Sequence, residues 1–301
     1  MKFKNIGNTN EKISEIGIGT WKMGIDINHE INAIKLGIKN GINFIDTAEL
    51  YGTEYLVSKS IKNIERENVF IATKVSPHHF HYNDVIKACN NSLKNLNIKQ
   101  IDLYQLHWPN YNIEISETMK AMEKLVDDGK IRYIGVSNFT LKELDGAQNA
   151  MKKYNIVSNQ VEYNIITRGI EKDLLKYCEK EKITIIAYSP LARGYLFSKK
   201  YYKLYQFLDT IGKKYKKSAT QTALNFIISG KNAIAIPKAS SEKHVIENIG
   251  ASGWKLNKRD LEQIENFLKN NKIKRNSLSD TYGPIMKRTS SIWSKLMTNK
   301  Q

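Results

Sequence analysis

The sequence alternates between short apolar strands and amphipathic helices along most of its length, and this alternation limits the folds open to the chain. Strands that alternate with helices of about 10–15 residues form βαβ units and pair in parallel. The pattern predicts eight strands, over residues 16–21, 42–46, 69–75, 101–108, 131–138, 156–164, 183–190 and 232–238. It predicts helices over residues 30–41, 82–97, 116–130, 141–155, 169–182 and 218–230.

Eight such units in a row favour a closed (β/α)₈ barrel, the TIM barrel. No linker rich in proline, glycine or serine divides the chain, so we expect one domain over residues 1–301. The alternative α/β fold is a doubly wound open sheet, which usually carries GxGxxG after its first strand. The corresponding stretch here, GIGTWKMG (17–24), does not have that spacing.

The composition is that of a soluble globular protein, with 41% hydrophobic and 26% charged residues. No window approaches the roughly 18 consecutive apolar residues of a membrane-spanning helix, and the N-terminus lacks the apolar stretch of a secretory signal. Cys89 and Cys178 stand alone, without CxxC spacing. We therefore expect a reducing, cytoplasmic setting, no membrane association and no structural metal.

The formal net charge is +17, which raises the alternative of a nucleic-acid-binding protein. Most basic residues are dispersed, as solvated surface lysines would be. The exception is residues 198–217, where lysines and tyrosines interleave. We expect no nucleic-acid partner, and a DNA-binding assay at several salt concentrations would test this expectation.

Polar or titratable side chains stand at the ends of the predicted strands, whereas the strand bodies are mostly apolar. In a TIM barrel the active site lies at the carboxyl ends of the strands. Each polar residue alone also has an ordinary structural explanation, such as a helix cap or a hydrogen-bonded buried histidine. Their convergence on one barrel mouth favours a functional site. The residues at or near strand ends are Asp46, Tyr51, Lys74, His107, Ser137, Asn138, Gln160, Tyr188, Ser189 and Lys238.

Four of these residues can work together to donate a proton, with Tyr51 as the donor. A tyrosine has an unperturbed pKa near ~10, and a neighbouring ammonium lowers it by favouring the phenolate. A buried lysine needs a counter-charge. Our hypothesis is that Asp46 keeps Lys74 charged, that Lys74 lowers the pKa of Tyr51, and that His107 hydrogen-bonds the substrate oxygen.

These four residues, in the settings FIDTAELYG (44–52), IATKV (71–75) and LHWP (106–109), resemble the catalytic tetrad of the aldo-keto reductase superfamily. The resemblance covers nearly the whole chain. It implies a β-hairpin, here residues 2–17, at the base of the barrel, and a C-terminal segment that helps to select the substrate. It also implies NADPH, or less often NADH, as the cofactor. Further matching motifs are GTW (19–21), GVSNF (135–139), NQVEYN (159–164), AYSPLARG (187–194) and IPKASS (236–241).

The resemblance also implies roles for single residues. Tyr51 would be the general acid of carbonyl reduction, tuned by Asp46 and Lys74, and His107 would orient the carbonyl. Trp21 and Trp108 would wall the substrate pocket, which Tyr51 and His107 would also line. The implied cofactor contacts run from the nicotinamide to the adenine. They are Thr20, Trp21, Ser137, Asn138, Gln160, Tyr188, Ser189, Leu191, Gly194, Lys238, Ser240, His244, Glu247 and Asn248.

One departure from the family pattern concerns the adenosine phosphate. An arginine often follows the lysine of IPK by six residues, and this chain has His244 there. The serine that often follows that lysine is Ala239 here. We therefore expect NADPH as the cofactor, with NADH possible.

The sequence thus predicts an NADPH-dependent reductase of aldehyde or ketone carbonyls, acting on a small-molecule substrate. The alternative is a noncatalytic NADP(H)-binding regulatory subunit, because channel-associated members of the superfamily can keep the tetrad. We expect a monomer or a weak homo-oligomer. Residues 109–115, 191–209 and the tail from about Ile273 to Gln301, with Tyr282 and Trp293, are expected to choose the substrate.

Overall fold

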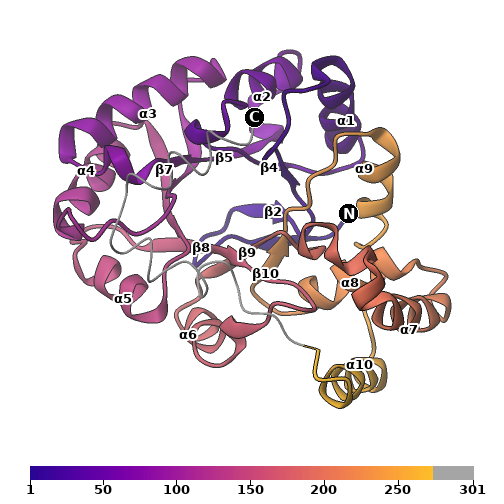
Figure 1. The fold of residues 1–301 in the computed structure, drawn as a ribbon. Coiled ribbons are helices and arrows are strands. Elements are labelled where there is room, and N and C mark those ends of the chain that lie inside the picture. The colour runs from indigo at the N-terminus through magenta and orange to yellow at the C-terminus, as the bar shows by residue number, and fades with distance from the viewer. Residues whose placement is uncertain (274–301) are drawn as a thin grey trace.

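Eight parallel strands form a barrel in the computed structural model, which describes residues 1–273 (Figure 1). Parallel bridges from Ile16 to Ala235 and from Gly19 to Lys238 join the last strand to the first. This closure confirms the predicted barrel and excludes the open sheet. The strands, each paired with the next, are β3 (Ile18–Gly19), β4 (Phe44–Asp46), β5 (Phe70–Val75), β6 (Ile101–Leu106), β7 (Ile131–Ser137), β8 (Ile156–Glu162), β9 (Thr184–Tyr188) and β10 (Ala233–Ala235).

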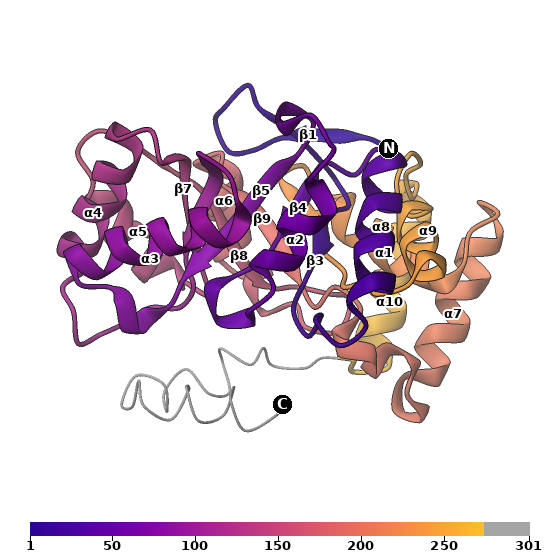
Figure 2. The same ribbon diagram turned by 90° about the horizontal axis from the view of Figure 1, so that it is seen from above.

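Helices surround the barrel, as Figures 1 and 2 show from two directions. The six predicted helices are present as α1 (Ile27–Lys39), α3 (Tyr82–Leu96), α4 (Ile115–Asp127), α5 (Leu141–Asn149), α6 (Leu174–Lys180) and α8 (Ala219–Ile228). Four more are α2 (Glu54–Ile61), α7 (Tyr202–Lys213), α9 (Glu242–Ile249) and α10 (Lys258–Asn270). Several begin at strong caps. Thr140 and Ser218, for example, each form a capping box at the start of α5 and α8.

The strands are buried on both faces, which explains their apolar runs. One face of each strand packs inside the barrel, and the other packs against the helices. The large outer cluster lies between sheet and helices and includes Ile45, Ile71 and Tyr104. The inner cluster consists of Ile6, Ile13, Phe44, Phe70, Ala72, Leu103, Val157, Ile186, Ile234 and Ile236.

The predicted hairpin is present and closes one end of the barrel. Its strands β1 (Phe3–Asn5) and β2 (Lys12–Ser14) pair antiparallel. Ile6 and Ile13 are fully buried in the inner cluster. The Lys4 Nζ donates hydrogen bonds to the carbonyls of Ile228, Gly230 and Ala233, at 2.5, 2.6 and 2.7 Å. These bonds tie the hairpin to the segment between the end of α8 and the start of β10.

The segment after β9 contains more helix than the predicted loop over residues 191–209. A kinked 3₁₀ segment (Ala192–Phe197), in which Arg193 and Gly194 have non-helical backbone angles, and a short 3₁₀ turn (Lys199–Tyr201) lead directly into α7. Leu204, Leu208 and Ile211 are buried on one face of α7, and the neighbouring lysines are exposed. Residues three or four positions apart lie on the same face of a helix, so these side chains form one apolar stripe. Burial of this stripe stabilises the helix.

No helix within residues 1–273 is long and apolar enough to cross a membrane. The same residues contain no group of three or more His, Cys, Asp or Glu side chains that could hold a metal ion. Apart from Ile273, the tail predicted to help choose the substrate, with Tyr282 and Trp293, lies outside the described residues. The extent of the domain and the oligomeric state stay predictions.

Candidate active site

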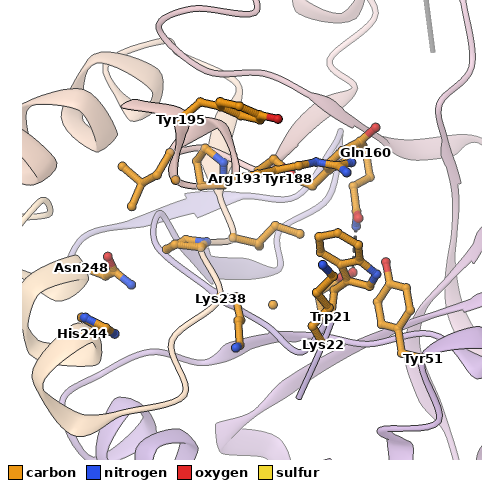
Figure 3. A pocket seen from close by; sticks show the side chains of 18 of the residues that line it. Trp21, Lys22, Tyr51, Gln160, Tyr188, Arg193, Tyr195, Lys238, His244 and Asn248 are labelled. Atoms are coloured by element: carbon orange, nitrogen blue, oxygen red, sulfur yellow. Dashed lines mark hydrogen bonds between the residues drawn. The ribbon is translucent and has the colours of Figure 1, made fainter. Parts of the chain in front are cut away.

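A cavity of about 770 Å³ opens at the carboxyl ends of the strands (Figure 3). It brings together most of the residues predicted from the sequence, although they come from different strands and loops. Those that line it are Trp21, Asp46, Tyr51, His107, Trp108, Ser137, Asn138, Gln160, Tyr188, Ser189, Leu191, Gly194, Lys238, His244, Glu247 and Asn248.

Three predicted residues do not line the cavity. The Lys74 side chain is completely buried beneath it. The Thr20 hydroxyl is also fully buried, and its Oγ1 lies 2.9 Å from Thr53 Oγ1, so Thr20 fastens the turn after β3 to the start of α2. Ser240 lies between β10 and α9, outside the lining. A direct contact of Thr20 or Ser240 with a ligand in this cavity is therefore not supported.

Asp46 and Lys74 form a buried ion pair between neighbouring strands. Asp46 is the last residue of β4, and Lys74 is the fifth of the six residues of β5. The Lys74 Nζ donates to Asp46 Oδ1 at 2.6 Å and to the Thr47 carbonyl at 2.8 Å. Burial lowers the pKa of Lys74, and the Asp46 carboxylate partly opposes this effect.

The second oxygen of Asp46 is held by two amides. Gln160 Nε2 donates to Asp46 Oδ2 at 2.7 Å, and Gln105 Nε2 donates to the same oxygen at 3.3 Å. The carboxylate is thereby satisfied on both sides, as a buried charge requires. Gln105 was missed in the sequence, although a glutamine in the apolar strand IDLYQL was a usable signal.

The Tyr51 hydroxyl lies within reach of both Lys74 and His107. Tyr51 ends a short 3₁₀ turn (Glu49–Tyr51) that follows β4. Its oxygen is 3.4 Å from Lys74 Nζ and 3.5 Å from His107 Nε2. Burial, and then the Asp46 carboxylate, raise the pKa of Tyr51 well above its usual value, whereas Arg193 opposes the rise. The phenol therefore keeps its proton at neutral pH. Lys74 is not among the causes of this shift, of which burial is the largest, so the lowering of the Tyr51 pKa by Lys74 stays a hypothesis.

His107 is held neutral. Burial, and then the charge of Lys74, keep its pKa well below the usual value. Its ring meets Tyr51 edge-on, with centroids 5.4 Å apart. Nδ1 is buried and has no hydrogen-bond partner within residues 1–273, and Nε2 faces the Tyr51 hydroxyl. A neutral imidazole in this position can share a hydrogen bond with a ligand oxygen beside Tyr51.

A second network fixes the wall formed by β7, β8 and β9. Asn138 Nδ2 donates to the His107 carbonyl at 3.1 Å, and the Tyr188 hydroxyl donates to Asn138 Oδ1 at 2.9 Å. Ser137 Oγ donates to the Gln160 carbonyl at 2.9 Å. Asn138 adopts a left-handed backbone (φ 63°), which asparagine tolerates better than most residues. The Tyr188 ring is thereby held at the cavity wall.

Several lining residues were not singled out in the sequence, and two of them are cations, of which Arg193 lies within the predicted substrate-choosing residues 191–209. Lys22 Nζ and Arg193 Cζ lie 4.7 and 4.9 Å from the centre of the Trp21 ring. Within the described chain, neither these two cations nor Lys238 has a carboxylate at ion-pair distance. The usable signal was the position of Lys22 directly after the motif GTW and of Arg193 within the motif AYSPLARG. The other lining residues that were not singled out are Gly19, Pro190, Thr220, Ile236 and Pro237, whereas Tyr195 and Phe197 belong to residues 191–209, which were predicted to choose the substrate.

Comparisons with known proteins agree with this geometry. Residues 15–269 match the model of the Aldo/keto reductase family. Methylglyoxal reductase YeaE of Escherichia coli (strain K12) is 36% identical over 256 residues, which cover 83% of this chain and 89% of the relative. Glyoxal reductase of Bacillus subtilis (strain 168) is 34% identical, and the match covers 85% of this chain and 90% of the relative.

Solved structures are similar over comparable lengths. A thermostable aldo-keto reductase in complex with the inhibitor epalrestat has a TM-score of 0.83 and 39% identity, covering 88% of this chain and 99% of that one. An aldo-keto reductase from Klebsiella pneumoniae in complex with NADPH has a TM-score of 0.82 and 33% identity, covering 89% and 95%. The protein described here belongs to the Aldo/keto reductase family.

Proposed function

We propose that this protein reduces aldehyde or ketone carbonyls to alcohols with a hydride from NADPH, and that Tyr51 is the proton donor. The observation that carries the proposal is the position of the Tyr51 hydroxyl. It lies at the cavity, 3.4 Å from Lys74 Nζ and 3.5 Å from His107 Nε2. A protonated phenol next to a hydrogen-bonding imidazole is an arrangement suited to general acid catalysis.

The cavity has properties that fit a dinucleotide phosphate. Lys22 and Lys238 are cations without an ion-pair partner in residues 1–273, and phosphates gain charge-assisted bonds from such groups. The lining carboxylates Asp46 and Glu247 are hydrogen-bonded by neighbours, Asp46 by Lys74 and Glu247 by Ser218. Lys238, His244 and Asn248 would bind the adenosine half. Tyr188 and Asn138 would hold the nicotinamide half near Tyr51. Reductase relatives and an NADPH complex within the family support this assignment.

The residues of this chain would act as follows. His107 Nε2 hydrogen-bonds the carbonyl oxygen and holds it beside the Tyr51 hydroxyl. NADPH, when bound, supplies the hydride. Tyr51 transfers its proton to the oxygen as negative charge develops there. The Lys74 ammonium, 3.4 Å away, then stabilises the phenolate, and Asp46 keeps that ammonium in place.

Small aldehydes and dicarbonyl compounds are the substrate class that we favour. Two relatives are named for methylglyoxal and glyoxal reduction. Trp21, Trp108, Tyr195 and Phe197 give the cavity an aromatic lining, against which a small carbonyl compound would pack.

Oxidation of NADPH by the purified protein tests the proposal. The decrease in absorbance at the nicotinamide band would be followed with methylglyoxal, glyoxal, benzaldehyde, diacetyl and a set of oxo acids. We expect turnover of at least one of these compounds and its loss in Tyr51→Phe. A protein that binds NADPH tightly and reduces none of them would contradict the proposal.

A further inference from the structure

The Arg193 guanidinium lies in the cavity without an anionic partner. Its Cζ stands 4.9 Å from the centre of the Trp21 ring, and no carboxylate within residues 1–273 is at ion-pair distance. Figure 3 shows Arg193 beside Tyr188, over Trp21 and near Gln160, at the Tyr51 end of the cavity. His244 and Asn248 lie at the other end. An unpaired guanidinium at the reacting end is well placed for an anionic group of a ligand.

The backbone holds Arg193 in this position. Ala192, Arg193 and Gly194 all have positive φ, at 52°, 55° and 85°. Residues with a side chain adopt this region only in a few per cent of cases, and such strain tends to persist at ligand clamps and active sites. Hydrogen bonds from Ala192 N to the Ser189 carbonyl (2.8 Å) and from Gly194 N to the Leu191 carbonyl (3.1 Å) fix the turn. The backbone of Arg193 is therefore held in a defined turn beside the cavity, which the exposed Arg193 side chain lines.

The charge of Arg193 reaches the reacting centre. Among the groups around Tyr51, Arg193 is the one that lowers its pKa, against the effects of burial and of Asp46. A group that acts electrostatically on the Tyr51 hydroxyl also acts on a substrate held against that hydroxyl. The flat guanidinium can donate two parallel hydrogen bonds to a carboxylate, which an ammonium cannot do.

We propose that Arg193 is a specificity-determining residue that binds a carboxylate of the substrate, so that the enzyme prefers carbonyl compounds carrying a carboxylate near the carbonyl group. This inference rests on the proposed reductase function, and it adds oxo acids and semialdehydes with a carboxylate to the small aldehydes and dicarbonyl compounds favoured above. The same guanidinium could instead meet the pyrophosphate of the cofactor, which offers similar oxyanions. The experiment separates these two sources.

Matched substrate pairs isolate the carboxylate. Pyruvate and methyl pyruvate share the same ketone, and succinic semialdehyde and its methyl ester share the same aldehyde at a longer distance from the charge. The ratio of kcat/KM for acid over ester would be measured in wild type, Arg193→Gln and Arg193→Lys. Because each pair is compared across variants, the intrinsic reactivity of the ester cancels. Lys200→Gln is the control, since Lys200 is exposed in the same segment and does not line the cavity.

We expect Arg193→Gln to lower the acid-to-ester ratio by about 10- to 100-fold for at least one pair, the usual range for a charge-assisted pair. Arg193→Lys should recover part of the ratio, and Lys200→Gln should leave it unchanged. Calorimetry provides a readout without turnover: propionate should bind the NADP⁺ complex of wild type more tightly than that of Arg193→Gln.

Three results would overturn the inference. The first is an unchanged ratio for both pairs in Arg193→Gln. The second is an equal loss for acids and esters together with weaker NADPH binding, which would assign Arg193 to the pyrophosphate. The third is an equal change in Lys200→Gln, which would indicate a general effect of net charge. In all three cases the esters are still reduced, whereas failure of the proposed function would leave every compound unreduced.

Discussion

Lys74 and Asp46 are joined by a 2.6 Å ion pair in which both side chains are almost completely removed from solvent, with exposures of 0% and 2%. Breaking such a pair from one side leaves an uncompensated buried charge, which is more costly than the pair is worth. The pair also fixes the ammonium 3.4 Å from the Tyr51 hydroxyl. One contact therefore contributes to stability and to the proposed chemistry, and mutations can separate the two effects.

Lys74→Met should lower the free energy of unfolding by about 3–5 kcal/mol, because Asp46 would stay buried without its partner. The double variant Lys74→Met/Asp46→Asn should regain most of this loss, since no charge remains. Neither variant should recover carbonyl reduction. Urea denaturation followed by circular dichroism measures the stabilities. Equal stability of wild type and Lys74→Met would contradict the buried pair.

Tyr51→Phe should lower kcat for aldehydes by about 10²–10⁴-fold, the usual effect of removing a general acid. The ring packing is retained, so the unfolding free energy and the dissociation constant for NADPH should change little. Stopped-flow kinetics and fluorescence titration give the two quantities. Turnover close to that of wild type would show that another group supplies the proton.

His107 should make stability depend on pH in acid. An unfolded histidine titrates near pH ~6.5, whereas burial and Lys74 hold the folded pKa well below that value. Below pH ~6.5 the unfolded chain therefore binds a proton that the folded chain does not, and the free energy of unfolding falls by roughly 1.4 kcal/mol per pH unit. This loss ends when the pH reaches the folded pKa.

The control for this effect is His107→Asn, which lacks the titrating ring. Between pH 7 and pH 5, wild type should lose more stability than the variant in parallel urea titrations. Identical pH profiles for the two proteins would mean that His107 is not held neutral in the folded state.

His244→Arg should increase the preference for NADPH over NADH. His244 lines the cavity at the end that holds Lys238 and Asn248 (Figure 3). An arginine would add a forked, permanently charged donor for the 2′-phosphate, so we expect about a tenfold larger ratio of the two dissociation constants. Lys243→Arg is the control, since Lys243 is exposed on the same helix and does not line the cavity. Equal tightening of both cofactors would exclude a phosphate contact.

The architecture and most of the site could be predicted because their signals are local. A buried parallel strand must be apolar, so a polar residue at its end, such as Asp46 or His107, stands out in the sequence. The strand order alone then predicts that these ends lie together, and no single contact has to be known. The place of the hairpin was expected only from the resemblance, because Lys4 contacts residues more than 220 positions away, and so were the cofactor roles of the strand-end residues.

The residues that were missed depend on tertiary geometry. Arg193 lies in residues 191–209, predicted to choose the substrate, but its own place at the cavity depends on a left-handed turn that the sequence does not predict. Gln105 was overlooked because its partner, Asp46, lies two strands away in the sheet order. Thr20 was placed with its neighbour Trp21, but its side chain points to Thr53 instead. The first part of α7, up to Asp209, was predicted as loop, since its lysines and tyrosines masked the apolar stripe.

The barrel seam has a consequence for how the protein is made. The first strand is held to the last by bonds from Gly17 N to the Ala235 carbonyl (2.8 Å), from Gly19 N to the Pro237 carbonyl (3.3 Å) and from Ala235 N to the Glu15 carbonyl (3.0 Å). During synthesis this edge of the first strand cannot pair with the last strand until about 220 further residues have left the ribosome. Trp21 and Lys238 line the cavity from the two sides of this seam. A ligand that contacts both residues links the first strand to the last once the barrel has closed. Amide hydrogen exchange at Gly17, Gly19 and Ala235 should therefore slow when the ligand binds.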